Sequence, residues 1–165
     1  MYKRQDLASQ ISAIKDEFLT YANAELNGAY VFSGTKTDTA PFNTTTYAYN
    51  GNSNITTIDI QDNISVKIGI DPAKTFKGAG GGEDVFAVFT DLEAAVLSGN
   101  AANIESAMAR LEVARQQIVS ARSEVGSTLV QVESYEERLA AVEVSLVEEL
   151  GPVSYTHLTL PTSPK

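Results

Sequence analysis

Large aliphatic residues recur at every seventh position along the C-terminal half of the chain. The series comprises Ile104, Leu111, Ile118, Val125, Val132, Leu139 and Leu146. Three residues after each member lies a second series: Ala107, Ala114, Ala121, Thr128, Tyr135, Val142 and Glu149. A period of 3.5 residues is typical of a helix that packs along other helices. We therefore predict one helix over residues 103–150, roughly 70 Å long at about 1.5 Å per residue. Its seam requires partners from other chains or from a longer version of this one.

A second amphipathic pattern opens the chain. Apolar residues alternate at steps of four and three, which predicts a helix over residues 6–26 that ends at Asn27-Gly28. The stripe comprises Leu7, Ile11, Ile14, Phe18 and Tyr21. We take Leu7, Ile11, Ile14 and Phe18, with the seven aliphatic residues of the first series, as the candidate helix-packing interface. A short extended piece over residues 29–33 follows.

Between residues 42 and 70 the hydrophobic period changes to two. Thr45, Tyr47 and Tyr49 alternate and lead into Asn50-Gly51, which is a strong signal for a type I′ hairpin turn. The alternation continues at Ile58, Ile60, Ile64, Val66, Ile68 and Ile70, with a turn at residues 61–63. This pattern predicts three or four short antiparallel strands with one buried face.

Glycine marks two further positions. The cluster Gly78–Gly82 predicts a flexible joint before a helix over residues 84–97, for which Asp84 is the expected cap. Gly126 lies inside the long helix, where glycine costs about 1 kcal/mol relative to alanine. We expect close approach of a neighbouring helix there, with a bend as the alternative.

These elements predict an α+β fold that is mainly α: a long-helix rod with a small antiparallel β insert. Residues 1–34 would supply a rod helix and a short strand. Residues 35–82 would form the β-rich outer domain with its Gly-rich hinge, and residues 83–150 the helical return that includes the long rod helix.

Residues 151–165 differ in character from the acidic helix before them. They hold three prolines and no acidic residue, so the helix should stop at Leu150. Residues 153–162 can be encoded by a transposon-type sequencing adaptor read in frame. We therefore interpret residues 151–165 as a non-native tail and leave them out of fold reasoning.

Composition excludes several classes of function. The net charge of −9 argues against nucleic-acid or anionic membrane partners, which require a basic face. The chain has no Cys and a single His, His157, which lies in the tail. Catalytic triads and ordinary zinc sites therefore cannot be built. The cluster Gly78–Gly82 is followed by Glu83-Asp84 and fits neither phosphate-binding motif. We predict no cofactor, no metal and no catalysis.

Two stretches resemble the flagellin superfamily, and one of them resembles its hook–filament junction proteins, the third hook-associated proteins. That family has an Asn-Gly turn, a Tyr-aliphatic-Phe-Ser-Gly strand and a Lys-Thr-Asp-Thr-x-Pro-Phe loop, which match residues 27–42. Residues 121–129 are similar to the Ala-Arg-x-x-aliphatic-Gly motif of the C-terminal helix, which flagellin shares. The resemblance covers residues 5–150 and implies that this chain is the middle of a longer protein.

The resemblance implies a structural subunit of the bacterial flagellum, exported through the flagellar secretion system to the cell exterior. Such a subunit would assemble as a ring between another hook-associated protein and flagellin, with an export chaperone as a further partner. Flagellin itself is the nearest alternative. A soluble coiled-coil adaptor whose β module binds a peptide or glycan is an alternative from another class, and an enzyme is the third.

Overall fold

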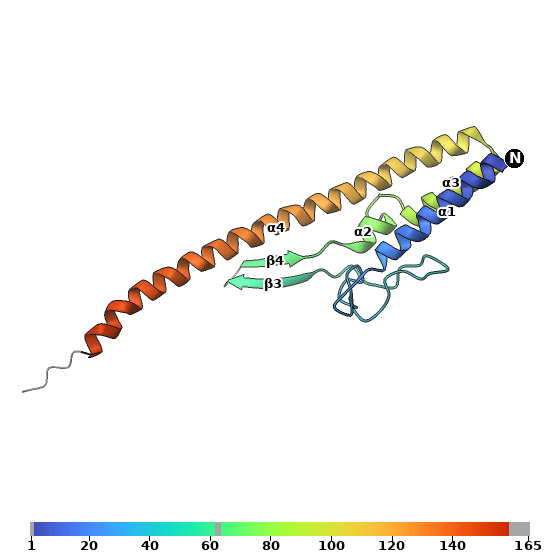
Figure 1. The fold of residues 1–165 in the computed structure, drawn as a ribbon. Coiled ribbons are helices and arrows are strands. Elements are labelled where there is room, and N and C mark those ends of the chain that lie inside the picture. Colours follow the sequence, from blue (N-terminus) through green and yellow to red (C-terminus); the bar gives the residue numbers. More distant parts are fainter. Residues whose placement is uncertain (1, 62–63, 159–165) are drawn as a thin grey trace, which may run out of the picture. The chain divides into compact units, whose positions relative to one another are not determined.

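Helices dominate the computed structural model, which describes residues 2–61 and 64–158. The elements in order are α1 (Tyr2–Ala22), β1 (Glu25–Leu26), β2 (Ala29–Tyr30), β3 (Thr56–Gln61), β4 (Ile64–Ile68), α2 (Pro72–Lys77), α3 (Val85–Ser98) and α4 (Ala101–Leu158) (Figure 1). The predicted fold class, mainly-α α+β, is confirmed. The chain divides after Gly126 into two units, and each is described here by itself.

The first helix ends earlier than its apolar stripe predicts. It stops at Ala22, and the side chain of Asn23 instead accepts a hydrogen bond from Phe42 N (2.8 Å) and donates one to Phe42 O (3.0 Å). Asn27-Gly28 does not cap this helix. With φ of 54° and 79° the two residues form the turn of a tight hairpin between β1 and β2.

Helices α2 and α3 each have a capping residue at both ends. Asp84 accepts hydrogen bonds from Phe86 N and Ala87 N, which confirms the predicted N-cap of α3. Asp71 caps α2 in the same way, with Pro72 in the first turn. The sequence pattern did not predict this helix. The segment expected to be a flexible joint, residues 78–82, is a hydrogen-bonded turn in which Gly82 N donates to Gly78 O at 2.9 Å.

Only two strands form in the described part of residues 42–70, fewer than the predicted three or four. β3 and β4 pair antiparallel with a register shift between Asp59 and Gln61, while the expected turn at 61–63 lies partly outside the described residues. The prediction of a hairpin turn at Asn50-Gly51 is wrong. Only one isolated bridge, Phe42 with Tyr49, forms before it. Gly51 instead allows the Tyr49 side chain to lie close to the backbone, since a Cβ there would lie 2.4 Å from the hydroxyl of Tyr49.

Two apolar clusters hold the first unit together. One joins α1, α3 and α4 and contains Ala8, Ile11, Leu92, Val96 and Ala107; Figure 1 shows α1 running beside α3. The other is aromatic and joins α1, α2 and α3 to the 32–49 segment; it contains Leu19, Ala22, Phe42, Phe76 and Phe86, flanked by Phe18, Phe32, Tyr47 and Tyr49. Its paired ring centroids lie 5.1 to 5.8 Å apart, within the range of favourable ring pairs. Residues 32–49 therefore pack into the core of the first unit.

The second unit is helical from Ser127 to Leu158 in its described part. The expected stop at Leu150 is wrong, because the helix continues through Gly151 and Pro152. Proline removes one backbone donor but does not remove the other hydrogen bonds of the helix. Among the described residues, no atom outside the surrounding helix backbone lies within 4 Å of a Cβ built on Gly126, so the close approach expected there is not seen in the described part of the chain. The origin of residues 151–165 stays a prediction.

Candidate assembly surface

The apolar stripe of α1 divides into a buried and an exposed line. Ile11 is buried in the first cluster, and Phe18 packs against Phe76, Phe86 and Phe89. Leu7 and Ile14 are 48% and 53% exposed, and Tyr21, seven residues further on, is also exposed. Residues seven apart lie on one helix face, so α1 presents an unpacked apolar line beside its packed one.

In the first unit, the smaller series of α4 is the more deeply buried one. Ala107, Ala114 and Ala121 are 3%, 1% and 8% exposed. The aliphatic residues Ile104, Leu111 and Ile118 are half-buried, and Val125 is exposed. Alanine permits close helix approach, whereas a larger side chain would need its own space. The sequence pattern identified this helix face, but it indicated the larger aliphatic residues, and not the alanines, as the main packing positions.

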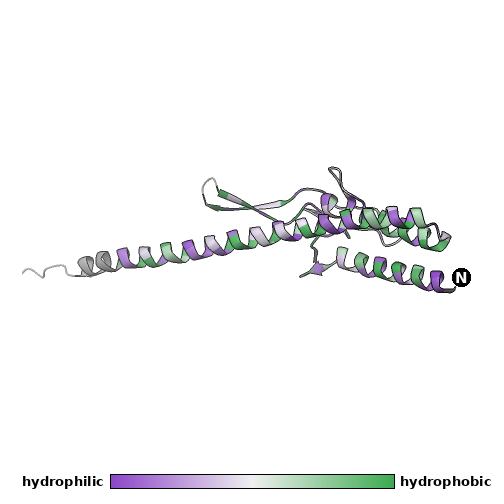
Figure 2. Cartoon of the chain, turned by 90° about the horizontal axis from the view of Figure 1, so that it is seen from above, coloured by the Kyte–Doolittle hydropathy of each residue, from purple (hydrophilic) through white to green (hydrophobic). Residues whose placement is uncertain are grey.

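In the second unit, most residues of the aliphatic heptad series are exposed. Val132 is half-buried, whereas Leu139 and Leu146 are 56% and 54% exposed. Further exposed apolar side chains are Leu129, Val130, Val142, Val144, Val147 and Leu150, and Figure 2 shows hydrophobic residues recurring between hydrophilic ones along α4. Rows of exposed apolar side chains of this extent mark interaction surfaces.

Acidic residues accompany this exposed seam. Residues 127–150 contain one base, Arg138, and six glutamates: Glu133, Glu136, Glu137, Glu143, Glu148 and Glu149. Six acids and one base give this segment a net charge of −5. A partner with basic residues flanking an apolar stripe would therefore complement it.

A buried lysine links α1 to α3, and the sequence analysis missed it. Lys15 Nζ donates to Glu93 Oε2 at 3.1 Å and lies 5.2 Å from the centre of the Tyr47 ring. The only signal in the sequence is position, because Lys15 stands four residues from both Ile11 and Leu19 on the buried face.

The pKa values of Arg110 and Tyr49 are both raised above their ordinary values. Arg110 donates to Asp91 (2.5 Å) and to Glu83 (2.9 Å), and these hydrogen bonds, that to Asp91 first, raise the pKa of its guanidinium. Burial, followed by the charge of Asp71, raises the pKa of Tyr49 to about 12. The Tyr49 hydroxyl donates to Asn52 O at 2.8 Å, so it is held in its protonated form.

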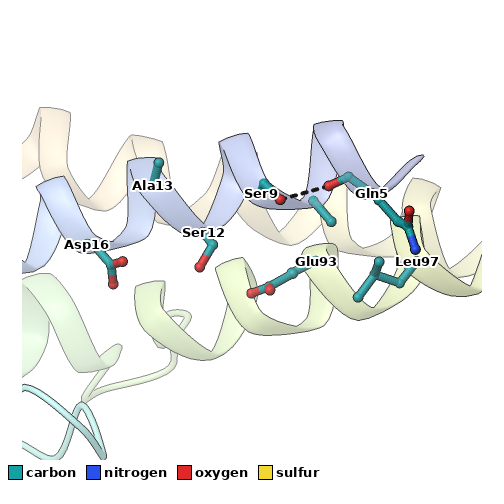
Figure 3. Close-up of a pocket in the computed structure, with 8 residues that line it drawn as sticks. Gln5, Ser9, Ser12, Ala13, Asp16, Glu93 and Leu97 are labelled. Atoms are coloured by element: carbon teal, nitrogen blue, oxygen red, sulfur yellow. Dashed lines mark hydrogen bonds between the residues drawn. The ribbon is translucent and has the colours of Figure 1, made fainter. Parts of the chain in front are cut away.

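A groove lies between α1 and α3. It encloses about 480 Å³ and is lined mainly by small residues of α1 and by Glu93 and Leu97 of α3 (Figure 3). Ser9 donates to Gln5 O within its own helix, and Glu93 is paired with Lys15. Across residues 2–61 and 64–158, no group of three His, Cys, Asp or Glu side chains is arranged to hold a metal ion. Nor does any helix in this range have the length and apolar character needed to cross a membrane.

The fold is mainly helical, and it leaves apolar seams exposed on α1 and α4. Comparison with known proteins shows that the chain is similar to flagellar hook-associated protein 3. It is 34% identical over 74 residues to that protein from Salmonella typhimurium, covering 44% of this chain and 23% of the relative. It is 28% identical over 153 residues to the Escherichia coli protein, covering 79% of this chain and 48% of the relative. No protein-family model matches the sequence.

The fold is shared with solved hook-associated proteins. The crystal structure of Xanthomonas campestris FlgL superposes with a TM-score of 0.77 at 16% identity, covering 90% of this chain and 82% of that one. The resemblance noted in the sequence is thus confirmed. The chain spans about half the length of the Escherichia coli relative and less of the Salmonella one. The role of the eleven candidate interface residues stays a prediction.

Proposed function

We propose that this chain is part of a structural subunit of the bacterial flagellum at the junction between hook and filament. The observation that carries the proposal is the coincidence of two features: similarity to flagellar hook-associated protein 3 and an apolar helical seam left exposed in the single chain. The chain would be exported and would assemble outside the cell as a ring. Another hook-associated protein, flagellin and an export chaperone would be its partners.

Assembly would depend on packing and not on catalysis. Leu139 and Leu146 of α4, and Leu7 and Ile14 of α1, each expose about half of their surface. Complete burial of such a side chain contributes about 1.5–3 kcal/mol, so burial of the exposed half contributes about 1 kcal/mol. Repeated around a closed ring, these increments would hold neighbouring subunits together. Residues 35–82 would form the outer domain of the subunit, joined to the helical body through Phe42, Phe76 and the rings packed around them.

Two alternatives remain distinct in what they predict. If the chain were a flagellin, it would be found along the whole filament. The loop at residues 33–42 instead resembles the junction proteins. A soluble coiled-coil adaptor would form a defined oligomer without flagellar partners. The similarity to hook-associated proteins favours the junction over both.

The proposal is tested by locating the protein in cells. The complete gene that contains the sequence of this chain, with an epitope tag, is introduced into a flagellated bacterium that lacks hook-associated protein 3. We expect the tag at the base of each filament and restored swimming. The double variant Leu139→Gln, Leu146→Gln should lose both, whereas Glu137→Gln on the same helix should retain them. Label spread along the filament would identify a flagellin, and label confined to a soluble oligomer would identify an adaptor.

A further inference from the structure

The Gly78–Gly82 turn between α2 and α3 is tight at its ends and unpacked in its middle. Gly78 caps α2 with φ 68°, and Gly82 N donates to Gly78 O. Gly80 and Gly81 have φ of 93° and 104°, and a Cβ on either would meet no atom within 4 Å. Gly81 N also donates to Gly78 O at 3.2 Å, so the middle of the turn is held by backbone hydrogen bonds without side-chain packing, and glycine permits many other conformations.

Glu83 attaches the end of this turn to α4 through both its backbone and its side chain. The Gln117 amide accepts from Glu83 N (2.5 Å) and donates to Glu83 O (3.0 Å). Arg110, seven residues earlier on the same face of α4, donates to the Glu83 carboxylate at 2.9 Å. A Cβ on Gly82 would lie 2.2 Å from Gln117 Oε1, so glycine is required for this approach.

The neighbouring contacts converge on the same place. Gln117 also donates to Thr75 O of α2 at 3.4 Å, and Lys77 of α2 pairs with Asp84, the cap of α3. Three helices thus meet around one residue of the connection. Ordering a glycine-rich segment costs conformational entropy, and the contacts of Glu83 offset that cost.

We propose that Glu83 is a latch that holds the Gly-rich turn closed against α4. Loss of its contacts with Gln117 and Arg110 converts the turn into a hinge between α2 and α3. The proposed opening is local, because residues 78–83 are not among the members of either apolar cluster. It is independent of the proposed function, since it depends only on contacts within this chain.

Hydrogen exchange of the Glu83 amide tests the latch in the complete chain. Gln117→Leu removes the acceptor and should speed exchange of this amide about tenfold. The control Gln116→Leu, on the exposed neighbour, should leave it unchanged. The amide of Leu92 in α3 should exchange at the same rate in all variants. Equal acceleration at Leu92 would mean global destabilisation and would overturn the proposal, as would an unchanged rate at Glu83.

A second variant separates the two halves of the latch. Glu83→Gln keeps the backbone pairing with Gln117 but removes the charge that faces Arg110. We expect exchange of this amide to rise about threefold at low salt. Added salt should speed exchange in the wild type, because the ion pair is partly exposed and screened, but not in Glu83→Gln. Identical salt dependence in both proteins would show that Arg110 takes no part.

Discussion

Replacing Ala114 by leucine tests whether the small residues of α4 set its packing in the first unit. Ala114 is 1% exposed and lies on the same face as Ala107 and Ala121. Leucine adds three carbon atoms where no space remains, and overpacking of this kind costs about 1–3 kcal/mol. Alanine and leucine have similar helix propensities, so the cost reports packing and not helix formation.

The assay is urea unfolding followed by circular dichroism at 222 nm. With a slope of about 1–3 kcal/mol per molar urea, Ala114→Leu should lower the midpoint by about 1 M. Ala109→Leu makes the same change at an exposed position five residues earlier in α4, and surface changes usually alter stability by less than about 0.5 kcal/mol. Equal midpoints for the two variants would refute the reasoning.

Three further predictions concern single contacts. Asn23→Ala removes the partner of both backbone groups of Phe42 and should cost about 2 kcal/mol in urea unfolding; an equal loss in the exposed-site control Asn54→Ala would argue against a specific contact. The pKa of Tyr49 is raised to about 12, so its contribution to stability is complete below the unfolded value near 10 and is lost as pH rises from there towards 12. Stability of Tyr49→Phe measured over this range should fall less than that of the wild type, and parallel curves would contradict the assignment. Gly126→Ala fills open space and should stabilise the isolated chain by about 1 kcal/mol, measured as a higher thermal midpoint; a lower midpoint would mean that this position is constrained.

The sequence predicted elements with a strong period and missed those decided by tertiary contacts. The heptad series located α4, and Asp84 located the start of α3. The two Asn-Gly pairs show the difference. Both carry the same local signal, but only Asn27-Gly28 forms a hairpin turn. At the other pair, Asn50 N donates to Pro41 O and Gly51 lies against the Tyr49 ring, which are contacts that no local pattern encodes.

The candidate surface was predictable as a face but not residue by residue. Period alone cannot say which of two neighbouring lines on a helix meets a partner within the chain. In α1, Ile11 is buried whereas Leu7 and Ile14 are exposed, although all three belong to one stripe. Lys15 lies on the buried line because Glu93 of α3 supplies its partner, and that pairing depends on the packing of α1 against α3.

Cysteine protection at the α4 seam tests the central claim most directly. Residues 1–165 contain no Cys, so a single introduced thiol reports one position within them. Leu146→Cys lies on the seam, and Glu148→Cys, two residues further on, points away from it. Both thiols should react rapidly with an alkylating reagent in the free chain. In isolated hook–filament junctions, we predict that Leu146→Cys reacts at least about tenfold more slowly, while Glu148→Cys changes little. Undiminished reactivity of Leu146→Cys in the assembled junction would contradict burial of the seam.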